Sequence, residues 1–321
     1  MSETMRAMVI RAFGGPEVFE ARQVPVPQPG PNEVLVRVHA TSVNPVDYKI
    51  RRGGAWAGVQ PPAIIGYDVS GVVVAVGPGV RDFRPGDEVY YTPEIFGGAP
   101  GSYAEYHVAR ESIVARKPRN LSHLEAAAVP LAGGTAWDAL ITRAGLRVGE
   151  RVLIHGAAGG VGSFAVQIAR AAGAYVFATA RGEAVEVVRS LGAHRVIDYQ
   201  KEDFVRVIRE ETGGEGVDVA LDTVGGEVLG RTLQVVRPHG RVVAIVNANA
   251  DLSPAFVKNV TVHFMFLERA RYKLDALREL IERGEIRPLI HGVMDLEQVA
   301  DAHRQIEQGG MRGKIVLRVA E

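Results

Sequence analysis

Residues 151–173 have the sequence RVLIHGAAGGVGSFAVQIARAAG, and this stretch decides the fold. It opens with a compact apolar run, RVLIH, which predicts a short buried strand. A glycine-rich turn follows, and after it apolar residues recur at steps of three and four, which predicts a helix. Gly173 stands where helices commonly end in a left-handed residue, so it predicts the helix C-terminus. The predicted apolar face of this helix consists of Val161, Phe164, Ala165, Ile168, Ala169 and Ala172.

The same alternation of strand and helix continues through the second part of the chain. Short β-branched runs and amphipathic segments follow one another with connections of a few residues. Because parallel strands joined by helices bury both faces of their sheet, the pattern predicts an α/β fold with a doubly wound parallel sheet. The predicted strands are 151–155, 175–179, 195–198, 217–224 and 241–246, and the predicted helices after the first are 183–191, 203–211 and 226–236.

The first part of the chain, up to about residue 125, predicts mostly antiparallel β-structure. In residues 33–40, EVLVRVHA, apolar and polar residues alternate as they do in a half-buried strand. Residues 71–77, GVVVAVG, are β-branched and bounded by glycines, which predicts a buried strand. Near the end of the chain, a helix that stops at Gly284 precedes a strand at 313–319, and we expect that strand to return to the first part.

The composition limits the classes of function. Lys+Arg and Asp+Glu are equal at 37 each, which argues against a nucleic-acid partner or a polybasic membrane anchor. The chain has no cysteine, which excludes disulfides, thiolate catalysis and cysteine-ligated zinc. The first residues lack the pattern of a secretory signal, and no apolar run approaches the about 20 residues of a membrane span. We therefore expect a soluble cytoplasmic protein without a nucleic-acid or membrane partner.

The turn at 155–162, HGAAGGVG, predicts a dinucleotide site. Its spacing is that of the dinucleotide fingerprint, with Ala157 in place of the first glycine. Gly159 would let the backbone approach a pyrophosphate, and Gly162 would let the helix pack closely against the strand. The helix N-terminus adds free N–H groups and a positive dipole. A plain glycine-rich turn without a ligand is the alternative. The residues assigned to the dinucleotide are Ala157, Gly159, Gly160, Val161 and Gly162.

The end of the second strand of this part, ATARGE at 178–183, bears on which nicotinamide cofactor binds. A site for NAD places an acidic residue there to bind the ribose, and this chain has Ala180. Arg181 follows, and a guanidinium suits a 2′-phosphate, so the pattern favours NADPH. Glu183 works against this interpretation, and Arg181 as a solvated surface charge is the alternative.

The stretch SVNPVDYKIRRG at 42–53 predicts a short, well-capped helix. Asn44 is a preferred N-cap residue, Pro45 is favoured at the first helical position, and Asp47 lies in the first turn, where it meets the helix dipole. Asp47 and Arg51 are four residues apart, so we expect them to form an ion pair along the helix.

The order and spacing of nine motifs make the chain resemble the medium-chain dehydrogenase/reductase superfamily, and most of all its zinc-independent quinone oxidoreductase branch. The resemblance covers nearly the whole chain. It implies a GroES-like β domain, formed by residues 1–125 and 268–321, around a Rossmann dinucleotide-binding domain at 126–267. It also implies that substrate and nicotinamide meet in a cleft between the two domains. The motifs are SVNPVDYKIR, PAIIGYDVSGVV, FRPGDEVY, GSYAEYHV, LAGGTAWDAL, VLIHGAAGGVG, LGAHRVIDY, GVDVALDTVGG and GKIVL.

The resemblance also bears on metal chemistry. Zinc-dependent members of the superfamily carry a cysteine near the NPVD stretch and a histidine in a GHE motif. This chain has no cysteine, and Tyr67, in GYD, stands where that histidine would be. We therefore expect no metal site. A quinone or an α,β-unsaturated carbonyl compound is the acceptor that suits such a site, because one or two hydrogen-bond donors and a proton from solvent are enough for its reduction.

The catalytic residues that the resemblance implies lie in the 42–53 stretch. Asn44 is expected to face the substrate carbonyl, and Lys49 and Tyr48 are the further candidates. Many members have a tyrosine where this chain has Lys49, so a tyrosine proton donor does not carry over. The alternative for all three is that they only cap and decorate the helix. The cofactor contacts implied are Thr135 near the nicotinamide ribose, Tyr199 near the adenosine phosphate, and Val246 and Phe266 on the carboxamide side, with core packing as the alternative for Phe266.

These observations predict an NADPH-dependent, zinc-independent reductase that transfers hydride to a quinone or an α,β-unsaturated carbonyl acceptor. A zinc-free alcohol dehydrogenase and an NADPH-binding sensor without turnover are the alternatives. The segment VTVHFMF at 260–266 predicts an apolar edge strand, and the resemblance implies that such a strand pairs with its twin in a homodimer.

Overall fold

The structure is a computed structural model that describes residues 3–247 and 249–320. It has two compact units. Unit 1 consists of residues 1–132, 269–284 and 288–321, apart from the residues not described, and unit 2 consists of residues 133–268 and 285–287. The fold is α/β, with a GroES-like β unit and a unit built on a parallel Rossmann-type sheet, as the sequence predicts. Helix α3 (Pro130–Trp137) contains the boundary between the units.

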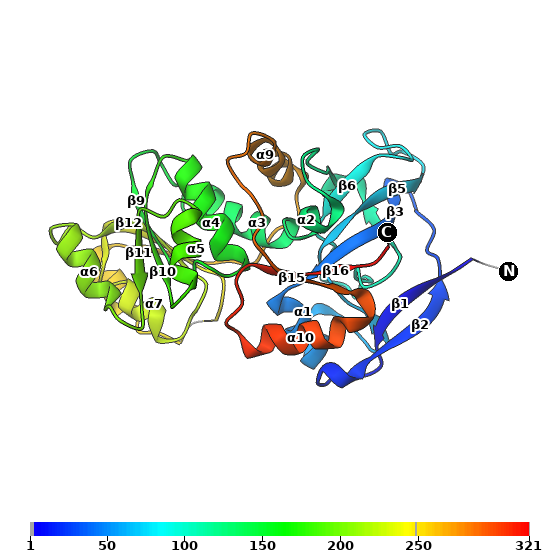
Figure 1. The fold of residues 1–321 in the computed structure, drawn as a ribbon, viewed down its shortest axis with the longest axis horizontal. Helices are drawn as coiled ribbons and strands as arrows, with labels where there is room; N and C mark the ends of the chain where they lie inside the picture. The colour runs from blue at the N-terminus through cyan, green and yellow to red at the C-terminus, as the bar shows by residue number, and fades with distance from the viewer. Residues whose placement is uncertain (1–2, 248, 321) are drawn as a thin grey trace. The chain divides into compact units, whose positions relative to one another are not determined.

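Unit 2 is organised around one parallel sheet with the strand order β11-β10-β9-β12-β13-β14. Counted from the first strand of the unit, this order is 3-2-1-4-5-6, which is the order of a Rossmann fold. Figure 1 shows α4 and α5 on one side of these strands and α6 and α7 on the other. The strands are β9 (Arg151–Ile154), β10 (Tyr175–Ala180), β11 (Arg195–Asp198), β12 (Val217–Asp222), β13 (Val236–Ala244) and β14 (Thr261–Phe264).

The helices of unit 2 form where the apolar residues recur with the helical period. In α4 (Gly160–Ala171) the buried residues include Phe164 and Ile168, and Gly173 follows the helix with a positive φ of 77°. The predicted helix and its end at Gly173 are confirmed. The core on the α6 and α7 side of the sheet is formed by aliphatic and aromatic side chains such as Leu153 and Ile208. The further helices are α5 (Ala184–Ser190), α6 (Phe204–Glu211), α7 (Glu227–Thr232) and α8 (Ser253–Lys258).

The helix predicted at 226–236 is too long, because α7 ends at Thr232. The residues that follow enter the sheet instead. Val236 opens β13 and pairs with Val217 of β12. The register between the two strands then shifts, and Pro238, which has no N–H to donate, lies in the shifted segment. Sheet pairing over a long chain distance therefore overrides the local helical pattern.

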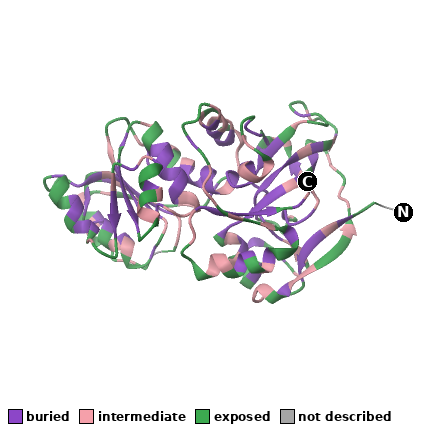
Figure 2. Cartoon of the chain, in the orientation of Figure 1, coloured by how far each residue is buried: buried purple, intermediate pink, exposed green. Residues whose placement is uncertain are grey.

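Unit 1 contains two β-sheets. The smaller has the order β2-β1-β4, and the larger has the order β15-β16-β3-β5-β6-β8, with β7 also paired to β3. Figure 2 shows that buried residues concentrate in inner strands such as β3, whereas the residues of β2 are exposed or half-buried. The strands are β1 (Thr4–Ile10), β2 (Phe19–Pro25), β3 (Glu33–Val43), β4 (Ala63–Ile64), β5 (Val69–Val76), β6 (Glu88–Tyr91), β7 (Tyr106–Arg110), β8 (Ala115–Arg116), β15 (Ile290–Asp295) and β16 (Lys314–Arg318).

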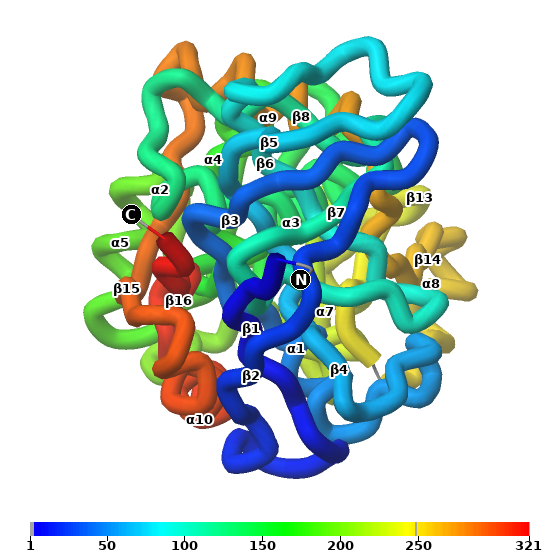
Figure 3. Tube along the Cα trace, turned by 90° about the vertical axis from the view of Figure 1, so that its right-hand side faces the viewer, coloured from blue at the N-terminus to red at the C-terminus, as the bar shows by residue number. Residues whose placement is uncertain are grey.

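The last strand returns to the first part of the chain, as predicted. β16 pairs antiparallel with the end of β3, where Ile315 lies opposite Val43 and Arg318 opposite Ala40, and the two strands can be followed side by side in Figure 3. Helices flank the sheets of unit 1. They are α1 (Pro45–Gly53), α2 (His123–Ala127), α9 (Arg271–Glu282), which ends before Gly284 as predicted, and α10 (Val299–Gln308). Of these, α2 packs on β3, β5 and β16 of the larger sheet.

The prediction of a fully buried strand at 71–77 is wrong for its second half. In β5, Val74 is 38% exposed and Val76 is 37% exposed. The neighbouring strand β6 pairs only with residues 69–72 of β5, so the rest of the strand has β3 on one edge and no partner from β6 on the other. A β-branched run of this kind indicates a strand, but it does not indicate where the neighbouring strand stops.

Gly162 is a position in unit 2 at which the backbone leaves no room for a side chain. A Cβ at this position would lie 2.2 Å from the carbonyl oxygen of Gly156 and 2.7 Å from Cα of Ala157, and both are backbone atoms that cannot rotate away. We expect Gly162→Ala to lower the free energy of unfolding by about 2–3 kcal/mol. Urea unfolding and calorimetry measure the change.

Gly292→Ala is the matched control, because a Cβ at Gly292 meets nothing within 4 Å. We expect its stability to be unchanged or slightly raised, since alanine restricts the unfolded chain more than glycine does. Equal stability of the two variants would contradict the close packing of α4 against the turn.

Candidate functional site

Helix α1 forms where the sequence predicts a helix and carries the three catalytic candidates. Pro45 is its first residue, and Asn44 is the N-cap in an extended conformation, with φ −126° and ψ 155°. Tyr48 is half-buried, and the Arg52 guanidinium lies 5.4 Å from the centre of its ring. Lys49 is exposed. The structure therefore brings these candidates together on one short helix, and Asn44 alone of the three is buried.

The cap of α1 is made by Asp47. Asn44 and Asp47 face each other as in a capping box, and the backbone N–H of Asn44 donates to Oδ2 of Asp47 at 2.8 Å. The Asn44 side chain makes no hydrogen bond to the helix N-terminus. Asp47 thus makes the capping contact, and the side-chain amide of Asn44 binds residues outside the helix.

The Asn44 amide belongs to a buried polar cluster with Asp68 and Lys314. Its Nδ2 donates to Oδ2 of Asp68 at 2.7 Å, and its Oδ1 accepts from Nζ of Lys314. The Lys314 ammonium also lies 3.3 Å from the Asp68 carboxylate, and the three residues are at most 3% exposed. This cluster joins the end of β3, the residue before β5 and the first residue of β16.

The predicted ion pair between Asp47 and Arg51 is wrong. Arg51 is fully buried and pairs with Glu307 of α10, at 2.6 Å. Its Nε also donates to the carbonyl of Gly14 at 3.0 Å. Asp47 accepts from the Tyr103 hydroxyl at 2.7 Å instead. The spacing along α1 allowed the pair, but partners from distant elements lie closer to both side chains.

A directed chain of hydrogen bonds connects Arg51 to Asp47. Arg51 can only donate, so its contact with Nδ1 of His303 at 2.9 Å makes that nitrogen the acceptor. The proton of the neutral imidazole then lies on Nε2, which is 3.1 Å from the Tyr103 hydroxyl. Burial, and the charge of Arg51, lower the pKa of His303 to about 3, so the ring is neutral. Tyr103 in turn donates to Asp47, where the chain of bonds ends.

Asp47 is a buried carboxyl group with an unusual pKa. Burial raises its pKa to about 7, against the opposing effect of the hydrogen bonds from Tyr103 and the Asn44 N–H and of the charge of Lys314. Asp68 adds a further negative charge nearby and raises the pKa as well. The second oxygen, Oδ1, has no hydrogen-bond partner among the described residues. Asp47 is therefore only partly ionised at neutral pH.

Tyr67 lies next to this cluster in sequence and in space. Its side chain is fully buried, and its hydroxyl has no hydrogen-bond partner among the residues that the structure describes. Burial, followed by the charge of Asp47, raises the pKa of Tyr67, so the phenol keeps its proton at neutral pH. Within residues 3–247 and 249–320, no three His, Asp or Glu side chains are grouped so that they could hold a metal ion.

In unit 2 the glycine turn leads directly into the N-terminus of α4. Gly159 is the N-cap residue, and no side chain caps the helix. Gly160, Val161 and Gly162 fill the first three helical positions, where backbone N–H groups have no acceptor within the helix. Three N–H donors with a positive dipole fit the pyrophosphate of a dinucleotide.

The rest of the turn is held by packing and backbone bonds. Ala157 is fully buried, and its N–H donates to the carbonyl of Thr179 in β10 at 3.1 Å. The close approach of Gly162 to Gly156 and Ala157 fixes the helix against the turn. Of the five residues assigned to the dinucleotide, Ala157 thus packs inside the turn. The other four, Gly159, Gly160, Val161 and Gly162, form the N-terminus of α4.

Arg181 and Tyr199 emerge at the same edge of the sheet, after neighbouring strands. The N–H of Tyr199 donates to the carbonyl of Ala180 at 3.1 Å, which puts the two segments side by side. Both side chains are exposed. The nearest acid on the adjacent strand, Asp198, is occupied by the N–H of Gln200 at 3.2 Å and the ammonium of Lys201 at 3.3 Å. This corner therefore offers an exposed guanidinium and an aromatic ring.

The three remaining cofactor candidates have different surroundings. Thr135 is buried in α3, Val246 is half-buried after β13, and Phe266 is exposed after β14. The exposure of Phe266 does not fit core packing. Four functional candidates were not singled out from the sequence, although charged or polar residues inside apolar segments gave a clue. They are Asp68 in GYD, Tyr103 in GSYAEY, His303 in α10 and Lys314 in GKIVL.

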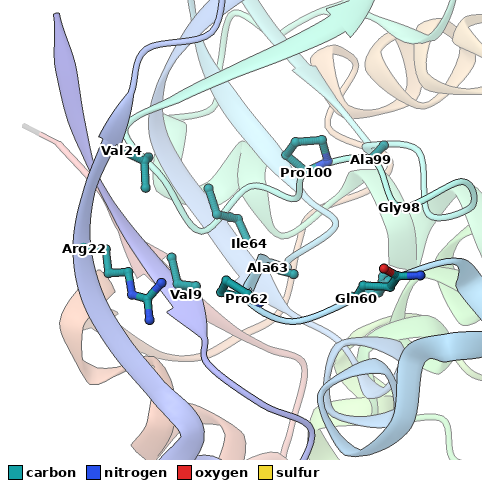
Figure 4. Close-up of a pocket in the computed structure, with 11 residues that line it drawn as sticks. Val9, Arg22, Val24, Gln60, Pro62, Ala63, Ile64, Gly98, Ala99 and Pro100 are labelled. Atoms are coloured by element: carbon teal, nitrogen blue, oxygen red, sulfur yellow. The ribbon is translucent and has the colours of Figure 1, made fainter.

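Unit 1 also has a half-open pocket of about 300 Å³, shown in Figure 4. It is bounded by β1, β2, β4 and the loop at 98–100, and its lining is mostly apolar, with Arg22 and Gln60 as the polar members. None of the residues assigned to catalysis or to the cofactor lines it. We give it no part in the reaction proposed below.

Comparison with protein-family models shows two matches. The model of the alcohol dehydrogenase GroES-like domain matches residues 30–119, and a model described as zinc-binding dehydrogenase matches residues 191–317. Among the described residues, no three His, Asp or Glu side chains are grouped so that they could hold a metal ion. No helix among the described residues has the length and apolar character needed to cross a bilayer.

Known proteins resemble the chain over almost its full length. A quinone oxidoreductase from Homo sapiens is 35% identical over 98% of this chain and 97% of its own. The NAD(P)H oxidoreductase RTN4IP1, mitochondrial, of Danio rerio is 32% identical over 91% of this chain and 84% of its own. The crystal structure of an NAD-dependent alcohol dehydrogenase superposes with a TM-score of 0.92 at 35% identity, covering 98% of this chain and all of that one.

The buried Asp47 makes stability depend on pH. Its pKa is about 7 in the folded chain and 3.8 in an ordinary carboxyl, so between these values the folded state binds more protons than the unfolded state. The free energy of unfolding therefore falls as pH rises from about 4 to 7. We expect Asp47→Asn, which cannot ionise, to gain about 4 kcal/mol relative to the unsubstituted protein across this window. Urea unfolding at a series of pH values measures the difference.

Tyr103→Phe provides the matched comparison. It removes the donor that lowers the pKa of Asp47, so the fall in stability should extend to higher pH than in the unsubstituted protein. Parallel stability curves for the protein and Asp47→Asn from pH 4 to 7 would show that Asp47 ionises freely in the fold.

Proposed function

We propose that this chain, which belongs to the zinc-independent quinone oxidoreductase branch of the medium-chain dehydrogenase/reductase superfamily, is an NADPH-dependent reductase of quinones or α,β-unsaturated carbonyl compounds. The observation that carries the proposal is the open N-terminus of α4, which ends a glycine turn in a Rossmann-type sheet. The relatives named above as quinone oxidoreductase and NAD(P)H oxidoreductase support the reaction class. We propose that the division at 126 and 267 separates a catalytic domain from the dinucleotide domain.

The residues of unit 2 fit a nicotinamide dinucleotide. The N–H groups of Gly160, Val161 and Gly162 would bind the pyrophosphate, which Gly159 lets approach. Arg181 would bind the 2′-phosphate of NADPH, since no carboxylate occupies the end of β10 and Asp198 is engaged elsewhere. Tyr199 would lie beside the adenosine. Reduced nicotinamide, when bound, supplies the hydride.

The other cofactor contacts are proposed at the nicotinamide end. Thr135 would bind the ribose through its hydroxyl. Val246 and Phe266 would hold the carboxamide side through backbone groups, and the exposed ring of Phe266 is consistent with a surface role. These assignments rest on the motifs by which the chain resembles the family.

The residues of α1 and its N-cap provide the donors for the acceptor. Hydride addition to a conjugated carbonyl moves negative charge onto its oxygen, and hydrogen-bond donors stabilise that charge. The Asn44 amide is the proposed donor to this oxygen. Lys49, as an exposed ammonium, and Tyr48, as a half-buried phenol, are the proposed further contacts. Water completes the reduction by supplying the proton.

The proposal is tested by following the oxidation of NADPH with a panel of quinones and enones. We expect turnover with NADPH in preference to NADH. Arg181→Ala should raise the KM for NADPH roughly tenfold, because it removes a charged hydrogen-bonding group from the phosphate, and should leave the KM for NADH unchanged. Arg189→Ala, at the other end of α5 and paired with Glu186, is the control and should change neither.

The outcomes separate the competing functions. NADPH bound with no turnover across the panel would favour a sensor protein, and turnover of alcohols alone would favour an alcohol dehydrogenase. An equal effect of Arg181→Ala on both cofactors would remove the basis for NADPH preference. We also propose a location in the cytoplasm, although the relative RTN4IP1 is named mitochondrial.

We also propose a homodimer joined at the open edge of β14. This strand is the last of its sheet, and Phe264 at its end is 57% exposed, with the exposed Phe256 and Val257 on α8. Apolar edges of this kind promote strand pairing. Sedimentation velocity should show a dimer, and Phe264→Lys should shift it toward monomer.

The matched control is Tyr272→Lys, which replaces an aromatic residue of equal exposure, 57%, on α9 of unit 1. It should leave the dimer intact. A monomer for the unsubstituted protein, or equal effects of the two substitutions, would contradict an interface at β14.

A further inference from the structure

We propose that Lys314 and Asp68 are positioning residues that hold the Asn44 amide so that one of its N–H groups is presented to the carbonyl oxygen of the acceptor. The inference rests on the proposed function and deepens it, because it names what sets the substrate-facing donor. It assigns a role to the first residue of the final strand, which is 270 positions from Asn44 along the chain.

The three side chains come from segments that only the tertiary fold brings together. Asn44 follows β3, Asp68 precedes β5 and Lys314 opens β16, and both β5 and β16 pair with β3. Ser42, also on β3, donates its hydroxyl to Asp68 at 2.6 Å. All four side chains are buried. Their positions are therefore fixed by the sheet of unit 1 and not by loops.

The orientation of the amide follows from the charges on either side of it. Lys314 can only donate, so the atom facing it is Oδ1 of Asn44. Oδ2 of Asp68 accepts from Ser42 and Lys314, and the Asn44 atom facing it, at 2.7 Å, is the donor Nδ2. Turning the amide over would place N–H groups against an ammonium and an oxygen against a carboxylate. A cation on one side and an anion on the other thus select one of the two orientations.

Counting donors shows which group has capacity left. The three N–H bonds of Lys314 have three acceptors, which are the Val43 carbonyl at 3.0 Å, Oδ1 of Asn44 and the Asp68 carboxylate at 3.3 Å. Asp68 accepts at both oxygens, since Oδ1 also binds the Leu131 N–H at 2.8 Å. The Asn44 amide has two N–H bonds, and only the one to Asp68 has an acceptor among the described residues. The second is the free donor of the cluster.

The cap of α1 explains why the oxygen of the Asn44 amide faces Lys314. An asparagine at an N-cap ordinarily uses its side-chain oxygen to accept from the helix N-terminus. In this chain Asp47 accepts from the Asn44 backbone N–H, and the amide makes no hydrogen bond to the helix end. Oδ1 is thereby left to Lys314, and the two N–H bonds of the amide, which an N-cap does not use, are one for Asp68 and one for a ligand.

The chemistry balances with this arrangement. Hydride adds to the conjugated carbon of the acceptor, the π electron pair moves onto the carbonyl oxygen, and a proton from water completes the enol or hydroquinone. The second N–H of Asn44 donates to that oxygen as its charge develops. The buried charge of Lys314 on Oδ1 polarises the amide, which makes its N–H groups better donors. Asp68 balances that charge and holds the other N–H.

The test uses a neutral variant, Asp68→Asn with Lys314→Met, which removes both charges and keeps similar volumes. Such replacement of a buried ion pair preserves folding better than loss of one partner. We expect kcat with menadione and with cyclohexenone to fall roughly 10- to 100-fold, with the dissociation constant for NADPH unchanged. Asn44→Ala should cause a similar fall.

The decisive comparison combines the substitutions. If the ion pair acts through Asn44, adding the neutral pair to Asn44→Ala should lower kcat no further, because the two changes remove one interaction. Lys117→Met is the control, since Lys117 is also buried in unit 1 and its partners among the described residues are the Pro118 and Leu121 carbonyls and the Glu88 carboxylate. It should lower stability without changing kcat.

Calorimetric binding of menadione without nicotinamide gives a readout that does not need turnover. The neutral variant and Asn44→Ala should weaken binding equally, and their combination should weaken it no more. This pattern without any turnover would support the positioning role while the proposed reductase function fails. Multiplicative losses, an effect no larger than that of Lys117→Met, or no menadione binding by the unsubstituted protein would overturn the inference.

Discussion

The buried ion pair between Lys314 and Asp68 is the interaction on which the candidate site of unit 1 depends. Removing two charges from water is costly, and their attraction offsets it only when the geometry is good and every other donor and acceptor is satisfied. Here the pair is 3.3 Å apart, and Ser42, Asn44, Val43 and Leu131 supply the remaining bonds. The condition cannot be met unless the end of the chain lies beside β3. The return of β16 is thus a requirement of the site as well as of the sheet.

Asp47 provides the second constraint on unit 1, which fixes helix α1. It takes over the helix cap from Asn44 and ends the line of hydrogen bonds that runs from Arg51 through His303 and Tyr103. Arg51 in turn joins α1 to α10 through Glu307. The orientation of α1 is therefore fixed at its N-terminus by the carboxyl group of Asp47 and in its last turn by the guanidinium of Arg51, both buried. Burial raises the pKa of Asp47, and its Oδ1 has no donor among the described residues, so the carboxyl group carries less charge than an ordinary aspartate.

The sequence predicts the parts of this protein that local periodicity and glycine chemistry control. The period of α4, its end before Gly173, the strands of the parallel sheet and the helix at 45–53 follow from neighbours a few residues apart. The helix at 226–236, the burial of 71–77 and the Asp47–Arg51 pair were wrong for a shared reason. In each, a partner from a distant segment decides the outcome: Val217 for β13, the end of β6 for β5, and Glu307 with Tyr103 for α1. Lys314 was not predicted because its partners, Asn44 and Asp68, lie 270 and 246 positions away along the chain.

The two units present their ligand groups by different physical means, and this sets how each tolerates change. In unit 2 the proposed phosphate donors are backbone N–H groups, which no substitution removes, so the constraint falls on residues whose added atoms would displace the backbone, above all Gly162. In unit 1 the donor is a side chain, and its direction is set by two opposite charges that have no backbone substitute. A neutral neighbour of similar shape would keep the fold of unit 1 but would let the Asn44 amide turn over. In unit 1 a substitution can therefore abolish the chemistry and leave the fold intact. In unit 2 a substitution that disturbs the phosphate site also disturbs the fold.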